Sequence, residues 1–357
     1  MPVSDIISGD QQDILRCPEC TGKTLVTKSA DTLDCTACNT AFPLIDEFGS
    51  ASLLASASKS AVKEDIQKWW GDLYKQAYQG HEDGLNRTMM AARLVDLEDL
   101  FKKREMLPTL EMPLTDLTGR RVLEIGSGSG AHSALFKRNG ATMTSVDITP
   151  KRVLATARKL ALVEEGAGGA YQADAENLPF RDNSFDIVYS NGVLHHSENT
   201  NQCIDEVYRV LKPGGNAVIM LYSRHSVIFW LNILPRALLT GEFFRWPEAQ
   251  WIGRLTEGKP KFGETKNPIT RVYSARQMQD LFGSFEIKSL RKNSFQFDNF
   301  CIPKLTQIRN TVFKAFGKKA HPGGLMVYGA PYIAETRLEL FLGRFFGFGW
   351  NIVAEKK

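Results

Sequence analysis

The sequence predicts an α/β fold with a small metal-binding unit at its N-terminal end, and two segments carry this prediction. In residues 121–149, a short apolar strand is followed by glycines at positions 126, 128 and 130, a helical run and a second apolar strand that ends on Asp147. This order is typical of the first β-α-β unit of a nucleotide-binding sheet. Two Cys-x-x-Cys pairs within residues 17–38 indicate the metal-binding unit.

The composition is that of an ordinary globular chain. It has 357 residues, 43% hydrophobic and 24% charged, so a sizeable core with appended elements is expected. The net charge of +4 is too small for a nucleic-acid coat, although residues 304–321 are locally basic. Residues 1–13 are polar and acidic, unlike a signal peptide, and the longest apolar run, 216–235, is interrupted by residues such as Arg224 and Asn232. The sequence therefore predicts a cytoplasmic protein without a membrane span.

Four of the six cysteines form two close pairs, Cys17 with Cys20 and Cys35 with Cys38, whereas the remaining two are isolated in the sequence. Each Cys-x-x-Cys turn points two sulfurs at one place, and the β-branched residues between the pairs favour a hairpin that brings the two turns together. Four thiolates suit a structural zinc ion, because they leave no open position for water. A redox dithiol would need a single pair at the start of a helix, which is absent; a degenerate site without metal stays open as an alternative.

The segment after the second cysteine pair, FPLIDEFG at 42–49, resembles the Trm112-like zinc ribbon family. Members of that family carry an aromatic-Pro-Ile-x-Asp-Gly turn at this point, and here Glu47 and Phe48 come before Gly49. Residues 49–63 are rich in Ser and Ala and are expected to form a linker. Such ribbons are often joined to methyltransferases, so the resemblance implies a ribbon with its linker over residues 1–60, ahead of a larger domain.

Residues 61–118 are expected to form a helical unit. Apolar and aromatic side chains, among them Trp69, Trp70 and Tyr74, recur at helical spacing, and residues 89–107 continue with a second amphipathic pattern. Packing of the aromatic stripe against the core is the simpler interpretation. A lid over a ligand pocket is the more specific interpretation, and the two interpretations are compatible.

The glycine loop does not identify its ligand. Gly126, Gly128 and Gly130, with Ala131, satisfy the pattern of a dinucleotide site as well as that of other nucleotide-binding loops. In each case the glycines let the backbone approach the ligand at a helix N-terminus, and an acid roughly twenty residues later binds ribose hydroxyls. The loop alone leaves both a dehydrogenase and a methyltransferase open.

The downstream sequence separates these two readings. Residues 170–196, AYQADAENLPFRDNSFDIVYSNGVLHH, and residues 204–222, IDEVYRVLKPGGNAVIMLY, resemble the successive motifs of class I S-adenosylmethionine-dependent methyltransferases, the group that includes the ubiquinone and menaquinone methyltransferases. The resemblance implies a Rossmann-like seven-stranded sheet of order 3-2-1-4-5-7-6, with only strand seven antiparallel. It places the core at 119–357, with cap insertions near 223–283 and 293–347 and with strands six and seven at 284–292 and 349–357.

The resemblance also implies roles for individual residues. Glu124 would anchor the loop and reach the methionine amino group, and Asp147 would bind both ribose hydroxyls. Asp174 would accept from the adenine amine, although a helix cap or a surface charge stays open as the role of each acid. The full implied set of cofactor-binding residues is Glu124, Gly126, Gly128, Gly130, Asp147, Ile148, Asp174, Ala175 and Asn191, with Ile148 against adenine and Asn191 beside the sulfonium.

Methyl transfer from a sulfonium is an in-line displacement, so positioning matters most and a base is needed only where the acceptor must lose a proton. His195 and His196 follow the fourth strand, at the rim to which the methyl group would point. A histidine titrates near neutral pH and would suit an alcohol or a phenol. His196 is the stronger candidate base; capping of the next helix and packing against the lid are the alternatives for the two rings.

The acceptor is expected to be a small, partly apolar or aromatic metabolite, because aromatic residues at 69–74, 229–230, 246 and 251 would surround the pocket mouth. An RNA substrate gripped by the ribbon is disfavoured, since residues 1–60 carry four basic against eight acidic residues. A lipid or quinone substrate stays open, with residues 227–239 in contact with a membrane surface. So does a scaffold without activity, and the sequence does not determine the oligomeric state.

Overall fold

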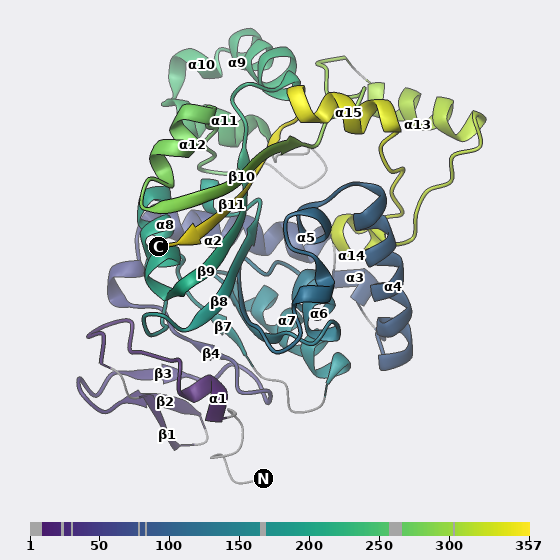
Figure 1. The fold of residues 1–357 in the computed structure, drawn as a ribbon. Helices are drawn as coiled ribbons and strands as arrows, with labels where there is room; N and C mark the ends of the chain where they lie inside the picture. Colours follow the sequence, from purple (N-terminus) through teal and green to yellow (C-terminus); the bar gives the residue numbers. More distant parts are fainter. Residues whose placement is uncertain are drawn as a thin grey trace.

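The computed structural model describes residues 9–357 except 23–24, 30, 78, 83, 165–168, 257–265 and 303. Its centre is an eight-stranded sheet with the order β10-β11-β9-β8-β5-β6-β7-β4 (Figure 1). The strands are β4 (Ala51–Ser52), β5 (Arg121–Ile125), β6 (Thr142–Asp147), β7 (Ala170–Gln172), β8 (Phe185–Asn191), β9 (Leu211–Tyr222), β10 (Phe285–Asn293) and β11 (Gly349–Lys356).

The predicted strand order is confirmed. From β7 to β10 the sheet runs 3-2-1-4-5-7-6 in the order of the methyltransferase strands, and β11 is antiparallel to both β9 and β10, while the other pairs are parallel. The eighth strand, β4, was not expected. It comes from the segment interpreted as a linker and pairs in parallel with β7, at the edge of the sheet.

Helices cover both faces of the sheet, so its strands are buried on both sides. Val122 of β5 packs with α4 (Arg87–Lys103), α6 (Ala131–Arg138) and α7 (Pro150–Val163), whereas the next residue, Leu123, packs on the other face with α8 (Thr200–Val210) and α12 (Ala275–Leu281). Alternation along a strand directs successive side chains to opposite faces, so a run of apolar residues is what this doubly covered sheet requires.

Local signals in the sequence set several helix boundaries. The Asn199 side chain accepts from the backbone N–H of Gln202 at the start of α8, and Ser274 and Gln277 form a reciprocal capping box at the start of α12. Thr336 and Glu339 form the same arrangement at α15 (Arg337–Phe346). Helix α7 begins with Pro150, whose fixed φ suits the first helical position.

The N-terminal ribbon is an antiparallel sheet of β1 (Leu25–Ser29), β2 (Thr32–Cys35) and β3 (Ala41–Pro43), preceded by α1 (Gly9–Gln12). It shares a hydrophobic core with the large sheet, in which Leu33 and Phe42 join strand residues such as Tyr171. The backbone also connects the two, because Leu15 and Phe180 form an antiparallel bridge. The ribbon is therefore packed against the β7 side of the core and not tethered at a distance.

Two insertions form a cap at the end of the molecule opposite the ribbon (Figure 1). The first contains the π-helical turn η5 (Phe229–Ile233), α9 (Leu234–Thr240), α10 (Glu242–Arg245) and α11 (Glu248–Thr256). The second contains α13 (Leu305–Ala315), α14 (Gly324–Tyr328) and α15. Along the chain, the segment that connects the ribbon to β5 is mostly helical. It contains η2 (Ser56–Ser58), α2 (Ala61–Ala77), α3 (Gln79–Glu82), α4, α5 (Leu107–Leu110) and η3 (Leu114–Asp116). Among the described residues, no helix is long and apolar enough to cross a membrane.

Candidate active site

The carboxyl ends of β5, β6 and β8 open on a cavity of about 510 Å³. The glycine loop forms its floor, α2 contributes one wall, and α14 of the second insertion contributes another. The loop and the insertion are in direct contact, since the Ser129 hydroxyl donates to the Met326 carbonyl at 3.2 Å. The carboxyl edge of a doubly wound sheet is where such folds bind ligands, and the cavity lies there.

Two of the loop glycines are required by close packing. Gly126 has φ 77°, and a Cβ at this position would lie 2.3 Å from a methyl group of Val193. Gly130 has φ 81°, and a Cβ there would lie 2.6 Å from Thr156 Cα. Positive φ and the absence of a side chain let the chain turn sharply into α6. Gly128 also has positive φ, and a Cβ there would meet only the Arg152 guanidinium, at the ordinary contact distance of 3.9 Å, so this position is less crowded than the other two.

Asp147, the last residue of β6, is buried at the edge of the cavity. The backbone N–H groups of Gly128 and Thr149 donate to its carboxylate at 3.0 and 2.9 Å, and the Arg152 guanidinium lies 3.9 Å away. Burial raises the pKa of Asp147, while Arg152 and the two N–H groups oppose that shift. The carboxylate is thus fixed in orientation by the glycine loop that it faces.

Glu124 of β5 is the second buried carboxyl at the cavity. The Ser133 hydroxyl donates to it, and Ser133 is itself held by Ser145 at 2.7 Å. Burial, with a smaller contribution from the charge of Asp147, raises the pKa of Glu124 to about 8. A carboxyl with this pKa is largely protonated at neutral pH and becomes a strong acceptor when a cation arrives beside it.

Asp174, in the turn after β7, is paired with Lys63 of α2. Lys63 Nζ lies 2.6 Å from the Asp174 carboxylate and 3.0 Å from that of Glu176, and the Glu176 N–H donates to Asp174 at 2.9 Å. All three residues line the cavity. Lys63 and Glu176 were not anticipated from the sequence, because the ion pair joins residues more than a hundred positions apart.

The remaining residues of the implied cofactor set divide into two groups. Ile148, Ala175 and Asn191 line the cavity together with Glu124, Gly126, Gly128, Asp147 and Asp174. Gly130 does not line it among the described residues and acts through the turn into α6. The structure thus brings residues from four different strand ends to one cavity, as the resemblance implied.

The two histidines after β8 occupy different environments. His196 lines the cavity, with its ring edge-on to Trp70 at a centroid distance of 5.1 Å. Its Nδ1 contacts the Ile269 carbonyl, the Thr270 hydroxyl and the Asn267 amide at 3.0–3.1 Å.

His195 is fully buried and does not line the cavity in the part of the chain that the structure describes. It stacks on Tyr222 at 3.9 Å, and burial holds its pKa well below the usual range. Its ring nitrogens have no hydrogen-bond partner among the described residues. His195 therefore packs behind the cavity wall, against Tyr222 and His196.

The aromatic residues of the cavity differ in part from those expected. Trp70 and Tyr74 of α2 line it, and Tyr222 and Tyr328 join them from β9 and α14. The expectation is wrong for the others, since none of Trp69, Phe229, Trp230, Trp246 and Trp251 lines the cavity among the described residues. Phe229 and Trp251 pack in the separate core of the first insertion, and Trp230 and Trp246 are exposed.

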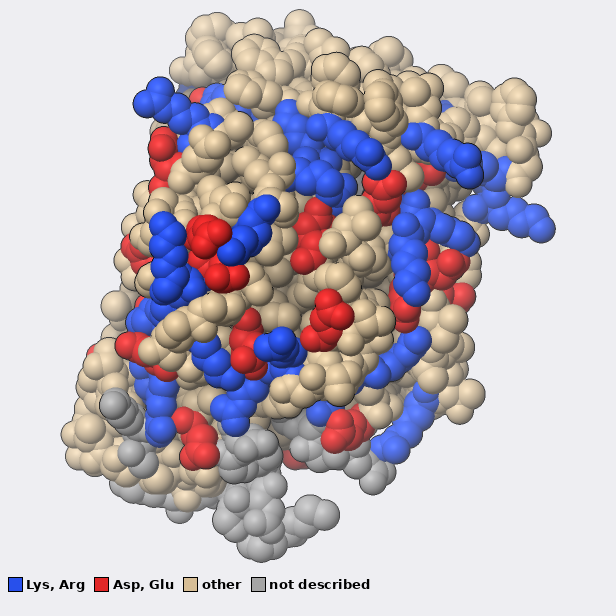
Figure 2. Space-filling model, viewed as in Figure 1, with Lys and Arg blue, Asp and Glu red and all other residues tan. Residues whose placement is uncertain are grey.

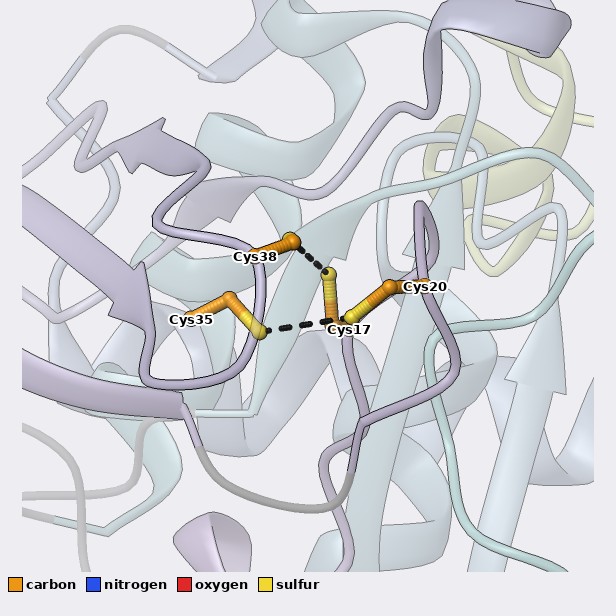
Figure 3. A group of neighbouring side chains, drawn as sticks. All are labelled: Cys17, Cys20, Cys35 and Cys38. Atoms are coloured by element: carbon orange, nitrogen blue, oxygen red, sulfur yellow. Dashed lines mark hydrogen bonds between the residues drawn. The ribbon is translucent and has the colours of Figure 1, made fainter.

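The four N-terminal cysteines converge on one point from two loops (Figure 3). Cys17 and Cys38 have their sulfurs 3.7 Å apart, Cys20 and Cys35 are 3.6 Å apart, and all four sulfurs lie within 4.8 Å of one another. With zinc–sulfur bonds of about 2.3 Å, a regular tetrahedron has sulfur–sulfur edges of about 3.8 Å. The residues present therefore fit a zinc ion bound by four thiolates.

Comparison with known proteins finds one family match and several similar chains. Residues 123–219 match the family described as a methyltransferase domain. The chain is 29% identical to a ubiquinone biosynthesis O-methyltransferase of Pseudomonas entomophila, over 57% of this chain and 94% of that protein. It is 32% identical to an uncharacterized methyltransferase of Synechocystis, over 37% of this chain and 62% of that one. The solved magnesium protoporphyrin IX methyltransferase of Synechocystis covers 83% of this chain and 100% of its own, at 13% identity and a TM-score of 0.46.

The family match, the relatives and the order of the sheet together define the class of enzyme. Together they support a class I S-adenosylmethionine-dependent methyltransferase, with the methyltransferase domain matched at residues 123–219. It is an enzyme that uses S-adenosylmethionine as its methyl donor. The dehydrogenase reading of the glycine loop is thereby set aside.

Proposed function

We propose that the protein transfers a methyl group from S-adenosylmethionine to a small metabolite with a substantial apolar or aromatic part. The observation that supports this is the set of aromatic and thioether side chains that line the cavity. Trp70, Tyr222 and Tyr328 face it together with Met220 and Met326, from three separate segments of the chain. Aromatic and thioether side chains bury large apolar areas with little polar requirement, so they favour an apolar acceptor.

The cofactor is proposed to lie along the strand ends. Glu124 would accept from the methionine ammonium, the backbone of Gly126 and Gly128 would border the methionine part, and Asp147 would accept from the ribose hydroxyls. Asp174, oriented by Lys63, would lie at the adenine end. S-adenosylmethionine supplies an activated methyl group on a sulfonium, and these residues hold it in one orientation so that the acceptor can attack in line.

His196 is proposed as the base for an acceptor that must lose a proton. Its Nδ1 is engaged with Ile269, Thr270 and Asn267, none of which lines the cavity among the described residues. Nε2 is then the nitrogen left to take a proton from the acceptor; it is buried, so the acceptor would have to pack directly against the ring. The acceptor–carbon bond would form as the sulfur–carbon bond breaks, and the proton would pass from the acceptor oxygen to the imidazole.

The four cysteines are proposed to hold one structural zinc ion. Four protein ligands leave no position for substrate or water, so this metal would act on the fold and not on the reaction. Cys17 and Cys35 are buried where the ribbon meets the core, whereas Cys20 and Cys38 are exposed. A metal bound here would fix both loops of the ribbon against the β7 side of the sheet.

The acceptor class is tested by incubating the protein with methyl-labelled S-adenosylmethionine and a cell extract separated into RNA, protein, lipid and small-molecule fractions. The proposal predicts label in compounds of low mass that an organic solvent extracts. Label confined to RNA or protein would contradict it. The Asp147→Ala variant serves as the control for label that arrives without the cofactor site.

A further inference from the structure

In each of three short helices of the cap, one charged side chain is buried while large apolar side chains at or next to the helix are exposed. In α15, Glu339 is fully buried and bonded to Arg309 at 2.8 and 3.0 Å, while Phe341 and Phe345 are more than half exposed. Amphipathic helices of a water-exposed surface show the opposite arrangement, with apolar residues toward the core. The inversion in α15 therefore indicates that its outer face meets something other than water.

The same inversion occurs in α13 and α10. Arg309 of α13 is buried, and Phe316, just past the end of that helix, is 85% exposed. In α10, Glu242 is buried and paired with Arg254 at 2.9 Å, whereas Phe244 is 77% exposed. We call the exposed apolar side chains of residues 230–246, 302–316 and 338–346 the cap face. Isolated apolar residues on a surface are ordinary, but a face of large aromatics built from several helices marks an interaction site.

The segments of the cap face are tied to one another. The Cys301 N–H donates to the Leu231 carbonyl at 3.0 Å, which joins the two insertions. Lys292 donates to the His225 and Phe345 carbonyls, which joins α15 to the start of the first insertion. In Figure 2, uncharged residues cover the end of the molecule where Figure 1 places α9, α10 and α15, and Lys and Arg side chains lie just below them.

The exposed charges within the described chain segments that form the cap face are all of one sign, although one of these residues, Arg344, is paired with Glu105 at 3.3 Å. In residues 227–247 and 301–347, the described residues that are both charged and exposed are basic: Arg245, Lys304, Lys314, Lys319, Arg337 and Arg344. The acids of these segments, Glu242, Glu335 and Glu339, are buried. The next exposed acid along the chain, Glu248, is paired with Arg224.

We propose that the cap face docks on an anionic lipid surface, with its aromatic and aliphatic side chains in the interface and the surrounding basic residues at the lipid phosphates. Helices with a strong apolar face and basic flanks lie in the plane of a membrane in this way. Two copies of the chain are a less suitable pair, because face-to-face contact would bring like charges together. The inference rests on the proposed function to the extent that a membrane would deliver an apolar acceptor.

Vesicle flotation of the full chain tests the docking directly. Phosphatidylcholine vesicles and vesicles that also contain phosphatidylserine are compared, at low and high salt. We expect flotation with the anionic vesicles, weakened by salt and by neutral lipid. Each change of Lys314, Lys319 or Arg337 to Gln is expected to weaken binding about fivefold, from the usual contribution of one basic residue near an anionic surface.

The variant Leu239→Ser with Phe244→Ser removes apolar contacts at exposed positions, and we expect flotation to fall at least tenfold. The matched control is Val95→Ser with Leu110→Ser, two exposed apolar residues outside the cap, which should float like the unmodified protein. Thermal unfolding and S-adenosylmethionine binding should be unchanged in both, which separates docking from folding.

Two results would overturn the docking. One is the absence of flotation with either type of vesicle. The other is a dimer in sedimentation that the Leu239 and Phe244 changes dissociate, in a protein that does not bind vesicles, because the cap face would then meet a second copy. Label in an apolar metabolite without vesicle binding would contradict the docking and agree with the proposed function. Vesicle binding with label only in RNA would support the docking and contradict the proposed function.

Discussion

At the scale of single residues, the site depends on two buried carboxyls that differ in how they are held. Two backbone N–H groups donate to Asp147 at 2.9 and 3.0 Å, which favours its ionised form. Glu124 receives the hydroxyl and the backbone N–H of Ser133, but burial outweighs both and raises its pKa to about 8. Asp147 is therefore suited to accept from neutral hydroxyls, and Glu124 to respond to a cation.

Replacing Asp147 with Ala should weaken S-adenosylmethionine binding by about 1.5–3 kcal/mol, or roughly ten- to more than a hundredfold, because two hydroxyls would lose a charged acceptor. Isothermal titration calorimetry gives this number directly. Asp65→Ala, at an exposed position of α2, is the control and should bind normally. Unchanged affinity in Asp147→Ala would place the ribose elsewhere.

The raised pKa of Glu124 makes cofactor affinity depend on pH. Below about pH 8 the free protein carries a proton on this carboxyl, whereas the bound ammonium favours the ionised form. Binding should then release a proton, and affinity should rise as pH increases from 6 toward 8, by at most about tenfold per pH unit. Calorimetry in buffers of different ionisation enthalpy counts the proton. Glu124→Gln should abolish the release, and an equal proton count in both proteins would contradict the assignment.

Replacing His196 with Ala should lower turnover far more than cofactor affinity, because the ring borders the cavity while the cofactor is held from the strand ends. Removal of a general base commonly costs about a hundredfold or more in rate. Rates measured from pH 6 to 9 should show an ionisation in the unmodified protein that the variant lacks. Equal profiles in the two proteins would indicate an acceptor that needs no base.

At the scale of elements, the ribbon supports the turn that carries Asp174. The Asn177 side-chain amide donates to the Pro18 carbonyl, inside the first cysteine turn, at 3.0 Å, and Asp174 and Asn177 are themselves bridged. Arg16 donates its N–H to the Pro179 carbonyl at 3.0 Å. The first cysteine loop and the end of the cavity at Asp174, where we propose that adenine binds, are therefore neighbours, and the order of one should affect the other.

Loss of the metal should accordingly weaken the cofactor site as well as the fold. The protein purified without chelator should contain one zinc per chain, and Cys38→Ser should reduce that content and lower the unfolding temperature. Asn177→Ala should keep the zinc but weaken S-adenosylmethionine binding about two- to tenfold, the usual range for one hydrogen bond. Metal analysis that finds no zinc would contradict the proposed metal site. Unchanged S-adenosylmethionine affinity in Asn177→Ala would contradict the proposed link between the ribbon and the cofactor site.

Elements with strong local signals could be predicted from the sequence, and those that depend on distant partners could not. The glycine loop, Asp147 and the cysteine turns each occupy a short segment with fixed spacing, and the sheet order followed from the resemblance to class I methyltransferases. Strand β4 had no such pattern, since Ala51 and Ser52 become a strand only by pairing with Tyr171 and Gln172.

The cap and the cavity wall show the same limit. The sequence identifies aromatic residues near the expected pocket. It does not show which hydrophobic core each of them joins. Phe229 packs within the first insertion, and Tyr222, the last residue of β9, faces the cavity. Lys63 reaches Asp174 only because the first turn of α2 lies beside the turn after β7 in the folded chain. Periodicity identifies the helix and leaves its partner undetermined.

At the scale of the whole molecule, the protein has two unlike ends (Figure 1). The cysteine ribbon packs on the β7 side of the sheet, and the apolar cap face with its basic rim lies at the opposite end, with the cavity between them. Docking through the cap would direct the ribbon away from the lipid surface. The cap end of the molecule would then capture the substrate, and the cofactor would bind in the cavity at the strand ends.

The central claim is that the methyl group goes to a small apolar acceptor. Its most direct test uses S-adenosylmethionine with a deuterated methyl group and mass spectrometry of an extract treated with the protein or with Asp147→Ala. The account predicts one or a few deuterium-marked compounds of low mass in the organic-soluble fraction, formed only by the unmodified protein. Deuterated methyl groups found only in nucleosides from digested RNA, or only in peptides, would contradict it.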